Sequence, residues 1–175
     1  MDFKVGQTFV DTYPPEAAEW CNGNRAYIIE VEKDGEHRQF QIVAYPKLSL
    51  KELKEEKKAR IDAETSAAIL AGFDYAVDGV TYHFSYDAFD QQNFSDTANV
   101  CLMKQAGMPG LPDSVTWNAY TVPGGDMVRL TFDASGFLAL YAGGAMRHKN
   151  GTMQRGGERK AAVEAAATAE EVEAA

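Results

Sequence analysis

Apolar and polar residues alternate with a period of two in three parts of the chain, and a turn sequence divides each part. The clearest part is 73–86, where Asp78-Gly79 separates two stretches rich in aromatic and β-branched residues. Asp-Gly is typical of a two-residue hairpin turn, because both turn residues need positive φ. The other parts are 26–43, with a turn at Asp34-Gly35, and 115–132, with a turn at 123–126. The pattern therefore predicts three antiparallel hairpins.

Helical patterns lie between the hairpins. The best defined spans about 87–106, where Asp87 can cap the first turn. Four apolar residues recur on one face of this helix at i, i+4, i+7 and i+8, namely Phe94, Ala98, Cys101 and Leu102. A shorter helix is expected within 12–23, with prolines at its start and Gly23 as a left-handed stop. Asp133 can cap a last long helix.

Two long helices are predicted to have little to bury. The first follows a capping box at Ser49–Glu52 and ends at Gly72, and its first half is nearly all charged. This composition predicts a semi-rigid connector. The second is the alanine-rich run 161–175, whose only large aliphatic residues are Val163 and Val172. Glycines at 143–144, 151 and 156–157 weaken the helix before it, so a frayed or partner-dependent helix is expected.

The elements together predict an α+β chain in which β-hairpins alternate with helices. We expect four segments along it. They are an N-terminal helix-hairpin unit (1–46), a charged connector helix (47–71), a central hairpin-helix-hairpin domain (72–149) and an alanine-rich C-terminal helix or tail (150–175).

Composition and charge narrow the classes of partner. The formal net charge of −9 repels phosphate backbones, which argues against nucleic-acid binding except through a local basic patch. Of the two candidate patches, 57–60 is surrounded by acidic residues and is interpreted as a solvated helix face, and the other is 147–149. No apolar run approaches the roughly 20 residues of a membrane span, and the first residues lack the pattern of a signal peptide. Cys21 and Cys101 lie in different predicted helices, which favours buried reduced thiols over a disulfide.

The residue inventory does not predict an enzyme, a metal site or a cofactor. The three histidines, His37, His83 and His148, have no second ligand at metal-binding spacing. No nucleophile-elbow, P-loop or dinucleotide-binding sequence is present. One polar cluster, 87–93, could hold a cation or a sugar, but helix capping and hydrogen bonds to the neighbouring hairpin explain the same residues.

Several blocks of the chain together resemble a domain of unknown function that occurs in tailed-phage and prophage proteins of the tail-fibre region. The blocks are Arg60–Glu64, Gly72–Tyr75, Tyr82–Asp87, Asp90–Asn93, Val115–Asn118 and Phe137–Leu140. The opening Tyr13–Asn22 is similar to small proteins of phage tail modules. The glycines in the last helix depart from the smoother family pattern. The family offers no established catalytic residues.

The resemblance implies a non-enzymatic tail protein, either a tail-fibre assembly protein or an accessory tail component. Its partners would be tail or fibre subunits or further copies of itself, with no nucleic acid and no membrane. It would act in the host cytoplasm during assembly or in the virion tail. The alternative is a virion-borne carbohydrate- or receptor-binding module. The candidate interaction residues are Trp20, Trp117, Asp87, Gln91 and Asn93.

Overall fold

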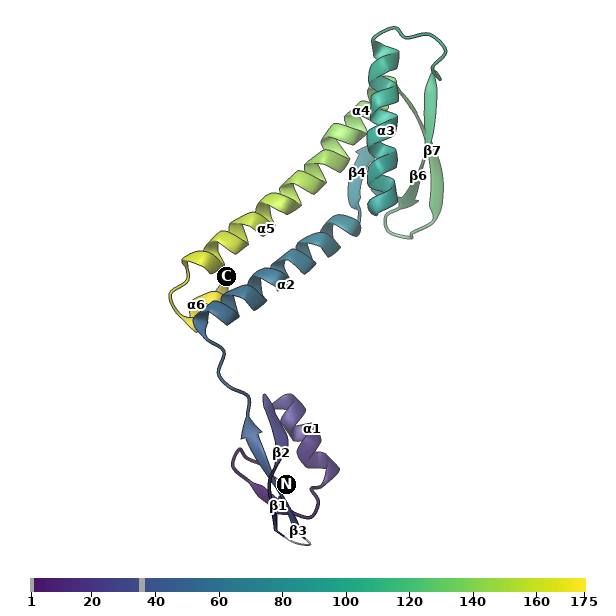
Figure 1. The fold of residues 1–175 in the computed structure, drawn as a ribbon. Helices are drawn as coiled ribbons and strands as arrows, with labels where there is room; N and C mark the ends of the chain where they lie inside the picture. The colour runs from purple at the N-terminus through teal and green to yellow at the C-terminus, as the bar shows by residue number, and fades with distance from the viewer. Residues whose placement is uncertain (1, 35–36) are drawn as a thin grey trace. The chain divides into compact units, whose positions relative to one another are not determined.

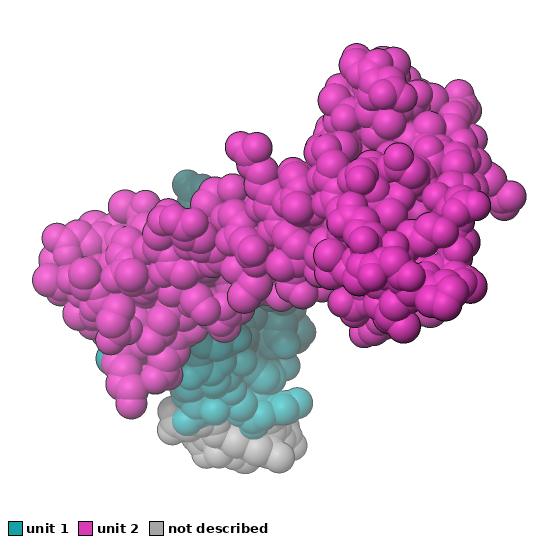
Figure 2. Space-filling view, turned by 90° about the horizontal axis from the view of Figure 1, so that it is seen from above, with its two compact units in different colours: residues 1–49 teal, residues 50–175 magenta. Residues whose placement is uncertain are grey.

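The computed structural model describes residues 2–34 and 37–175. Two compact units make up the chain, residues 1–49 and residues 50–175, shown in teal and magenta in Figure 2. The second unit takes in the predicted connector helix, the central domain and the C-terminal segment together. The predicted α+β class, with hairpins and helices in alternation, is confirmed.

The first unit is a three-stranded antiparallel sheet with one helix. Its strands are β1 (Thr8–Val10), β2 (Ala26–Asp34) and β3 (His37–Ala44), in the order β1-β3-β2, and its helix is α1 (Pro15–Gly23). Helix and sheet share a small core made of Phe3, Ala17, Cys21, Ala26 and Ile42. The predicted helix and hairpin are thus both present, with Pro15 in the first turn, where its missing amide costs nothing.

The end of α1 differs from the prediction. Gly23 is still helical, and the left-handed position falls on Arg25, with φ of 47°. The side-chain amide of Asn24 donates to the carbonyl of Trp20 at 2.8 Å and occupies one of the last helical carbonyls. The predicted turn at Asp34-Gly35 extends into residue 35, which lies outside the described residues.

The second unit is built on a four-stranded antiparallel sheet in the order β4-β5-β6-β7. Its strands are β4 (Phe73–Val77), β5 (Val80–Phe84), β6 (Ser114–Thr121) and β7 (Met127–Asp133). Asp78 and Gly79 both have positive φ, 50° and 81°, as the predicted two-residue turn requires. Helix α3 (Ala88–Gln105) follows β5, and α4 (Ala134–Leu140) follows β7. The two hairpins predicted in this region are confirmed.

An aromatic core joins α3 and α4 to one face of this sheet. Phe84, Phe94 and Phe137 are fully buried, and Phe94 lies 5.7 Å from Phe137 between ring centroids. The predicted buried face of α3 is confirmed for Phe94, Ala98 and Cys101. It is wrong for Leu102, which is 54% exposed, because a helical turn of 100° per residue carries that position past the edge of the sheet.

The last long helix is continuous through its glycines as far as Ala165, but the helix predicted over 161–175 is interrupted at Ala166, where ψ is 135°. Helix α4 passes into a π-helical segment, η1 (Tyr141–Met146), and then into α5 (Arg147–Ala165), with helical φ and ψ at both junctions. Gly144 lies inside η1, and a Cβ there would meet the Phe73 ring at 2.5 Å. This glycine therefore lets the helix approach β4 closely. A short helix, α6 (Ala169–Ala174), ends the chain.

The predicted connector is one half of a helix pair. Helix α2 (Leu50–Leu70) lies alongside α5, and α6 also packs against α2 (Figure 1). The seam is apolar and thin, with Ile61, Val163 and Val172 fully buried in it. A Cβ on Gly156 would meet the Thr65 hydroxyl at 2.4 Å, so this glycine permits the close approach. The alanine-rich segment is therefore packed against a partner inside the same chain.

Charged side chains flank this seam, and they correct the interpretation of 57–60 as a solvated face for Lys57, whereas Ala59 and Arg60 are exposed as expected. Lys57 is buried, and its ammonium donates to the carbonyl of Glu173 at 2.7 Å. Among the described residues, four ion pairs also join α2 to α5 and α6, namely Lys58–Glu164, Arg60–Glu173, Arg159–Glu64 and Lys160–Asp62. The polar faces of these helices thus meet each other.

Candidate functional site

Three of the five predicted interaction residues line one groove. Trp117, Asp87 and Asn93 surround a hollow of about 640 Å³ between the start of α3 and strand β6, called here the α3–β6 groove. Its walls are Ser85, Asp87, Phe89, Asp90, Asn93 and Thr97 on one side and Thr116, Trp117, Asn118 and Tyr120 on the other. The sequence spacing between residues 93 and 116 gave no sign of this convergence.

The groove exists because strands β5 and β6 pair over only two residues each and then diverge. Their pairing consists of Tyr82 opposite Thr121 and His83 opposite Tyr120. Strand β5 then ends at Phe84, and the chain turns through Asp87 into α3. The part of β6 from Ser114 to Ala119 therefore has no strand beside it on that side among the described residues.

Backbone geometry indicates which groups of β6 face the groove. Thr121 exchanges hydrogen bonds with the β6–β7 turn, accepting from the amide of Gly125 and donating to the carbonyl of Asp126, each at 2.9 Å. Successive residues of a strand direct their amides and carbonyls to opposite sides. The amides and carbonyls of Asn118 and Thr116 therefore point toward the groove, where they form an open strand edge.

Apolar surface borders this edge. Phe89 is 74% exposed, the largest exposure among the large hydrophobic side chains in the described part of the chain. Trp117 is half-buried, and its ring centroid lies 4.4 Å from that of Phe94 and 5.1 Å from that of Phe137. The tryptophan therefore belongs mainly to the core and lends only part of its surface to the groove.

Asp87 lies in the groove wall and also stabilises the start of helix α3. One of its carboxylate oxygens accepts from the amide of Asp90 at 2.8 Å, which caps α3 as predicted. Asp90 lies in the first turn, where a negative charge is favourable beside the helix dipole. Both carboxylates border the groove, so its α3 side is acidic.

The other two predicted interaction residues lie elsewhere. Gln91 donates to the carbonyl of Tyr86 at 3.3 Å and accepts from the ammonium of Lys149 at 2.8 Å, so it ties α3 to α5. Trp20 belongs to the first unit, where it packs against the core and borders a smaller hollow with Phe3 and Glu19. The predicted set is therefore divided among three places.

Comparison with known proteins places the second unit in a family. The family model that matches is described as a domain of unknown function, DUF4376, and it covers residues 52–175. The chain belongs to the DUF4376 family. No curated protein and no solved structure matches the chain. The DUF4376 match begins inside α2 and runs to the end of α6, so the helix pair and the sheet belong to one family domain, and the α3–β6 groove lies within it.

The described histidines each have a defined partner. In the DUF4376 domain His83 bonds to Asp74 across β4 and β5 at 2.9 Å, and the His148 ring lies 3.1 Å from the carbonyl oxygen of Ile69. In the first unit His37 bonds to Asp11, and this bond lowers the pKa of the Asp11 carboxyl. No group of three metal-ligating side chains occurs in the described part of the chain.

Both cysteines are buried and free. Burial raises the pKa of the Cys21 thiol and of the Cys101 thiol, which keeps each sulfur protonated and weakly nucleophilic. Across the described residues of this DUF4376 protein, no helix has the length and apolar character needed to span a bilayer.

Proposed function

We propose that this chain is a non-enzymatic phage tail protein, either a tail-fibre assembly protein or an accessory tail component, and that it binds a tail or fibre subunit through the α3–β6 groove. It would do so in the host cytoplasm during assembly or in the virion tail. The observation that carries the proposal is the open edge of β6 beside the exposed ring of Phe89. The resemblance to tail-region proteins supplies the class of partner.

An extended segment of the partner is the occupant that this surface favours. Unpaired amides and carbonyls of an edge strand bind a further strand through main-chain hydrogen bonds, and adjacent side-chain pockets supply selectivity. Asn118 and Thr116 offer such groups, and Phe89 offers an apolar contact next to them. Asp87 and Asp90 make the α3 wall negative, so the partner segment is expected to carry a lysine or an arginine.

A carbohydrate- or receptor-binding module is the second candidate. The groove brings part of an indole together with the Asn93 amide and the Asp87 carboxylate, and such groups suit hydroxyl-bearing ligands. The packing of Trp117 against Phe94 limits the aromatic face that a sugar ring could stack on, so strand addition is favoured. Glycan binding by the isolated protein, lost in Asn93→Ala with an unchanged melting temperature, would instead favour this candidate.

The test is co-expression with a candidate tail-fibre subunit, followed by a pull-down. Asn118→Pro removes one groove-facing amide and leaves the hydrogen bonds to β7 in place, so it should lower the amount of captured subunit at least tenfold. Asn118→Ala is the matched control, because it removes the side chain and keeps the amide. Equal capture by both variants would contradict strand addition.

A second pair of variants tests the apolar contact. Phe89→Ser should weaken capture, whereas Leu102→Ser changes another exposed apolar residue of α3, outside the groove, and should leave capture intact. If neither substitution lowers the amount of captured subunit, the contact surface lies outside the groove. Self-association that depends on Phe89 would identify a second copy of the chain as the occupant.

A further inference from the structure

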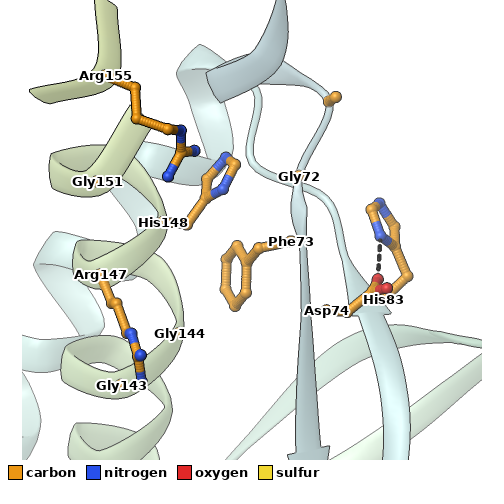
Figure 3. Close-up of a pocket in the computed structure, with 11 residues that line it drawn as sticks. Gly72, Phe73, Asp74, His83, Gly143, Gly144, Arg147, His148, Gly151 and Arg155 are labelled. Atoms are coloured by element: carbon orange, nitrogen blue, oxygen red, sulfur yellow. Dashed lines mark hydrogen bonds and ion pairs between the residues drawn. The ribbon is translucent and has the colours of Figure 1, made fainter. Parts of the chain in front are cut away.

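A second hollow of the DUF4376 domain gathers basic side chains in an acidic chain. It has a volume of about 620 Å³ and lies between the start of α5 and strands β4 and β5 (Figure 3). Arg147, His148 and Arg155 line it from α5, and His83 lines it from β5. Among the described residues, its lining includes one carboxylate, that of Asp74, which bonds to His83. The chain as a whole has a formal net charge of −9, so this local excess of positive charge is unusual.

The two arginines lack acidic partners. Farther along α5, Arg159 and Lys160 pair with Glu64 and Asp62 of α2. The Arg155 guanidinium instead donates to the Thr152 hydroxyl at 2.9 Å, and the Arg147 guanidinium has no hydrogen bond or ion pair among the described residues. Both guanidinium groups therefore keep donors that a ligand can use.

Gly151 lies midway between the two arginines on α5, and, like Gly157, it is not required to be glycine by packing. The three residues are spaced i, i+4 and i+8, so they form one stripe along the helix. A Cβ on Gly151 would meet a single atom, Arg155 Nη1, at an ordinary contact distance of 3.5 Å. Gly72 and Gly144, which line the same hollow, are required because a Cβ on either would collide with β5 or with Phe73. Glycine inside a helix is destabilising relative to alanine.

We propose that this hollow is a binding site for a small anionic ligand that carries phosphate or carboxylate groups. Guanidinium groups bind both oxyanions through paired N–H donors. The Arg155 guanidinium lies beside Gly151 and His148, and the Arg147 side chain extends toward Gly143, so the two groups offer donors to different parts of the hollow (Figure 3). The volume falls within the roughly 300–1,000 Å³ of small-molecule sites. This site is separate from the α3–β6 groove and does not depend on the function proposed for it.

The experiment is isothermal titration calorimetry of the full chain at constant ionic strength, with pyrophosphate in one series and citrate in the other. Saturable binding with a dissociation constant of 1 mM or lower is expected in at least one series, and the tighter series identifies the oxyanion as phosphate or carboxylate. Arg147→Gln and Arg155→Gln should each weaken binding about tenfold or more. Arg129→Gln makes the same change of charge on β7, outside the hollow, and should leave the affinity unchanged.

Two alanine variants separate binding from stability. Gly151→Ala should raise the melting temperature and weaken binding, because it strengthens the helix and places a methyl group 3.5 Å from Arg155 Nη1, beside the donors that would hold the anion. Gly157→Ala is the matched control in the same helix, where a Cβ would touch nothing within 4 Å. It should raise the melting temperature and leave binding unchanged.

Absence of saturable binding in both series, or equal losses in Arg129→Gln and Arg155→Gln, would overturn the proposal.

Discussion

The sheet and the helix pair of the second unit are held together in different ways. The sheet rests on a compact aromatic core in which Phe84, Phe94 and Phe137 are fully buried. The pair of α2 with α5 and α6 rests on a narrow apolar seam around Ile61, and ion pairs line its sides. Burial of apolar area is a large source of stability that charge screening does not weaken, whereas exposed ion pairs contribute little each and are screened by salt. The sheet should therefore be the more robust of the two regions.

The largest effect is expected from the aromatic core. Phe94 contacts four rings, with centroids 4.4–5.8 Å away. Phe94→Ala should lower the free energy of unfolding by about 3–5 kcal/mol, because it removes this burial and leaves a cavity. Urea denaturation followed by tryptophan fluorescence measures the loss. A change below about 1 kcal/mol would show that the sheet does not depend on this core.

A smaller loss is expected at the seam of the helix pair. Ile61 is fully buried between α2 and the C-terminal helices, so Ile61→Ala should cost about 2–4 kcal/mol. Hydrogen exchange should increase in α2 and α6 and stay nearly unchanged in β6 and β7. Uniform exchange across the second unit would show that the two regions unfold as one.

Replacing either of two neighbouring glycines of α5 with alanine should change the stability of the helix pair, in opposite directions. Gly156→Ala should destabilise the pair by about 1–3 kcal/mol, because its Cβ would lie 2.4 Å from the Thr65 hydroxyl. Gly157→Ala should stabilise it by about 0.5–1 kcal/mol, because its Cβ would meet nothing. Thermal unfolding of both variants under the same conditions measures the contrast. Two shifts of the same sign would contradict the close approach of α2 and α5.

The smallest expected effect is a loss of stability of the helix pair at low pH. A hydrogen bond from Arg159 lowers the pKa of the Glu64 carboxyl, and one from Lys58 lowers the pKa of the Glu164 carboxyl. A carboxyl with a lowered folded-state pKa contributes stability above its ordinary value of about 4.3, and that stability is lost as the pH falls further. Hydrogen exchange in α2 should therefore rise below this pH before exchange in β6 does. The reverse order would contradict the account.

Elements specified by nearby residues could be predicted from the sequence. Asp78-Gly79 sets its turn through positive φ at adjacent positions, and Asp87 caps α3 through a residue three positions away. The helix pair could not be predicted, because its contacts join distant parts of the chain. Lys57 meets Glu173, and Ile61 meets Val163, more than 100 residues away. Seen without these partners, α2 looks like a solvated connector and the alanine-rich end looks frayed.

The candidate sites, too, could be predicted only in part from the sequence. Trp117 and the residues 87–93 stand out in the sequence, but their meeting in one groove follows from the point at which β5 leaves β6. The hollow beside α5 has a sequence signal, the basic patch 147–149. Its geometry depends on Gly151 and on Arg155 one turn farther along, and on His83 from a distant strand. Tertiary placement, which no local pattern encodes, decides which polar residues act together.

Hydrogen exchange of the complex with a tail or fibre subunit tests the central claim most directly, because it compares both regions in one experiment. The account predicts slower exchange of the amides of Thr116 and Asn118 and of the first turn of α3 when the subunit is bound. Exchange in α2, α5 and α6 should not change. Protection confined to the helix pair, or no protection in β6, would contradict the assignment of the groove as the contact surface.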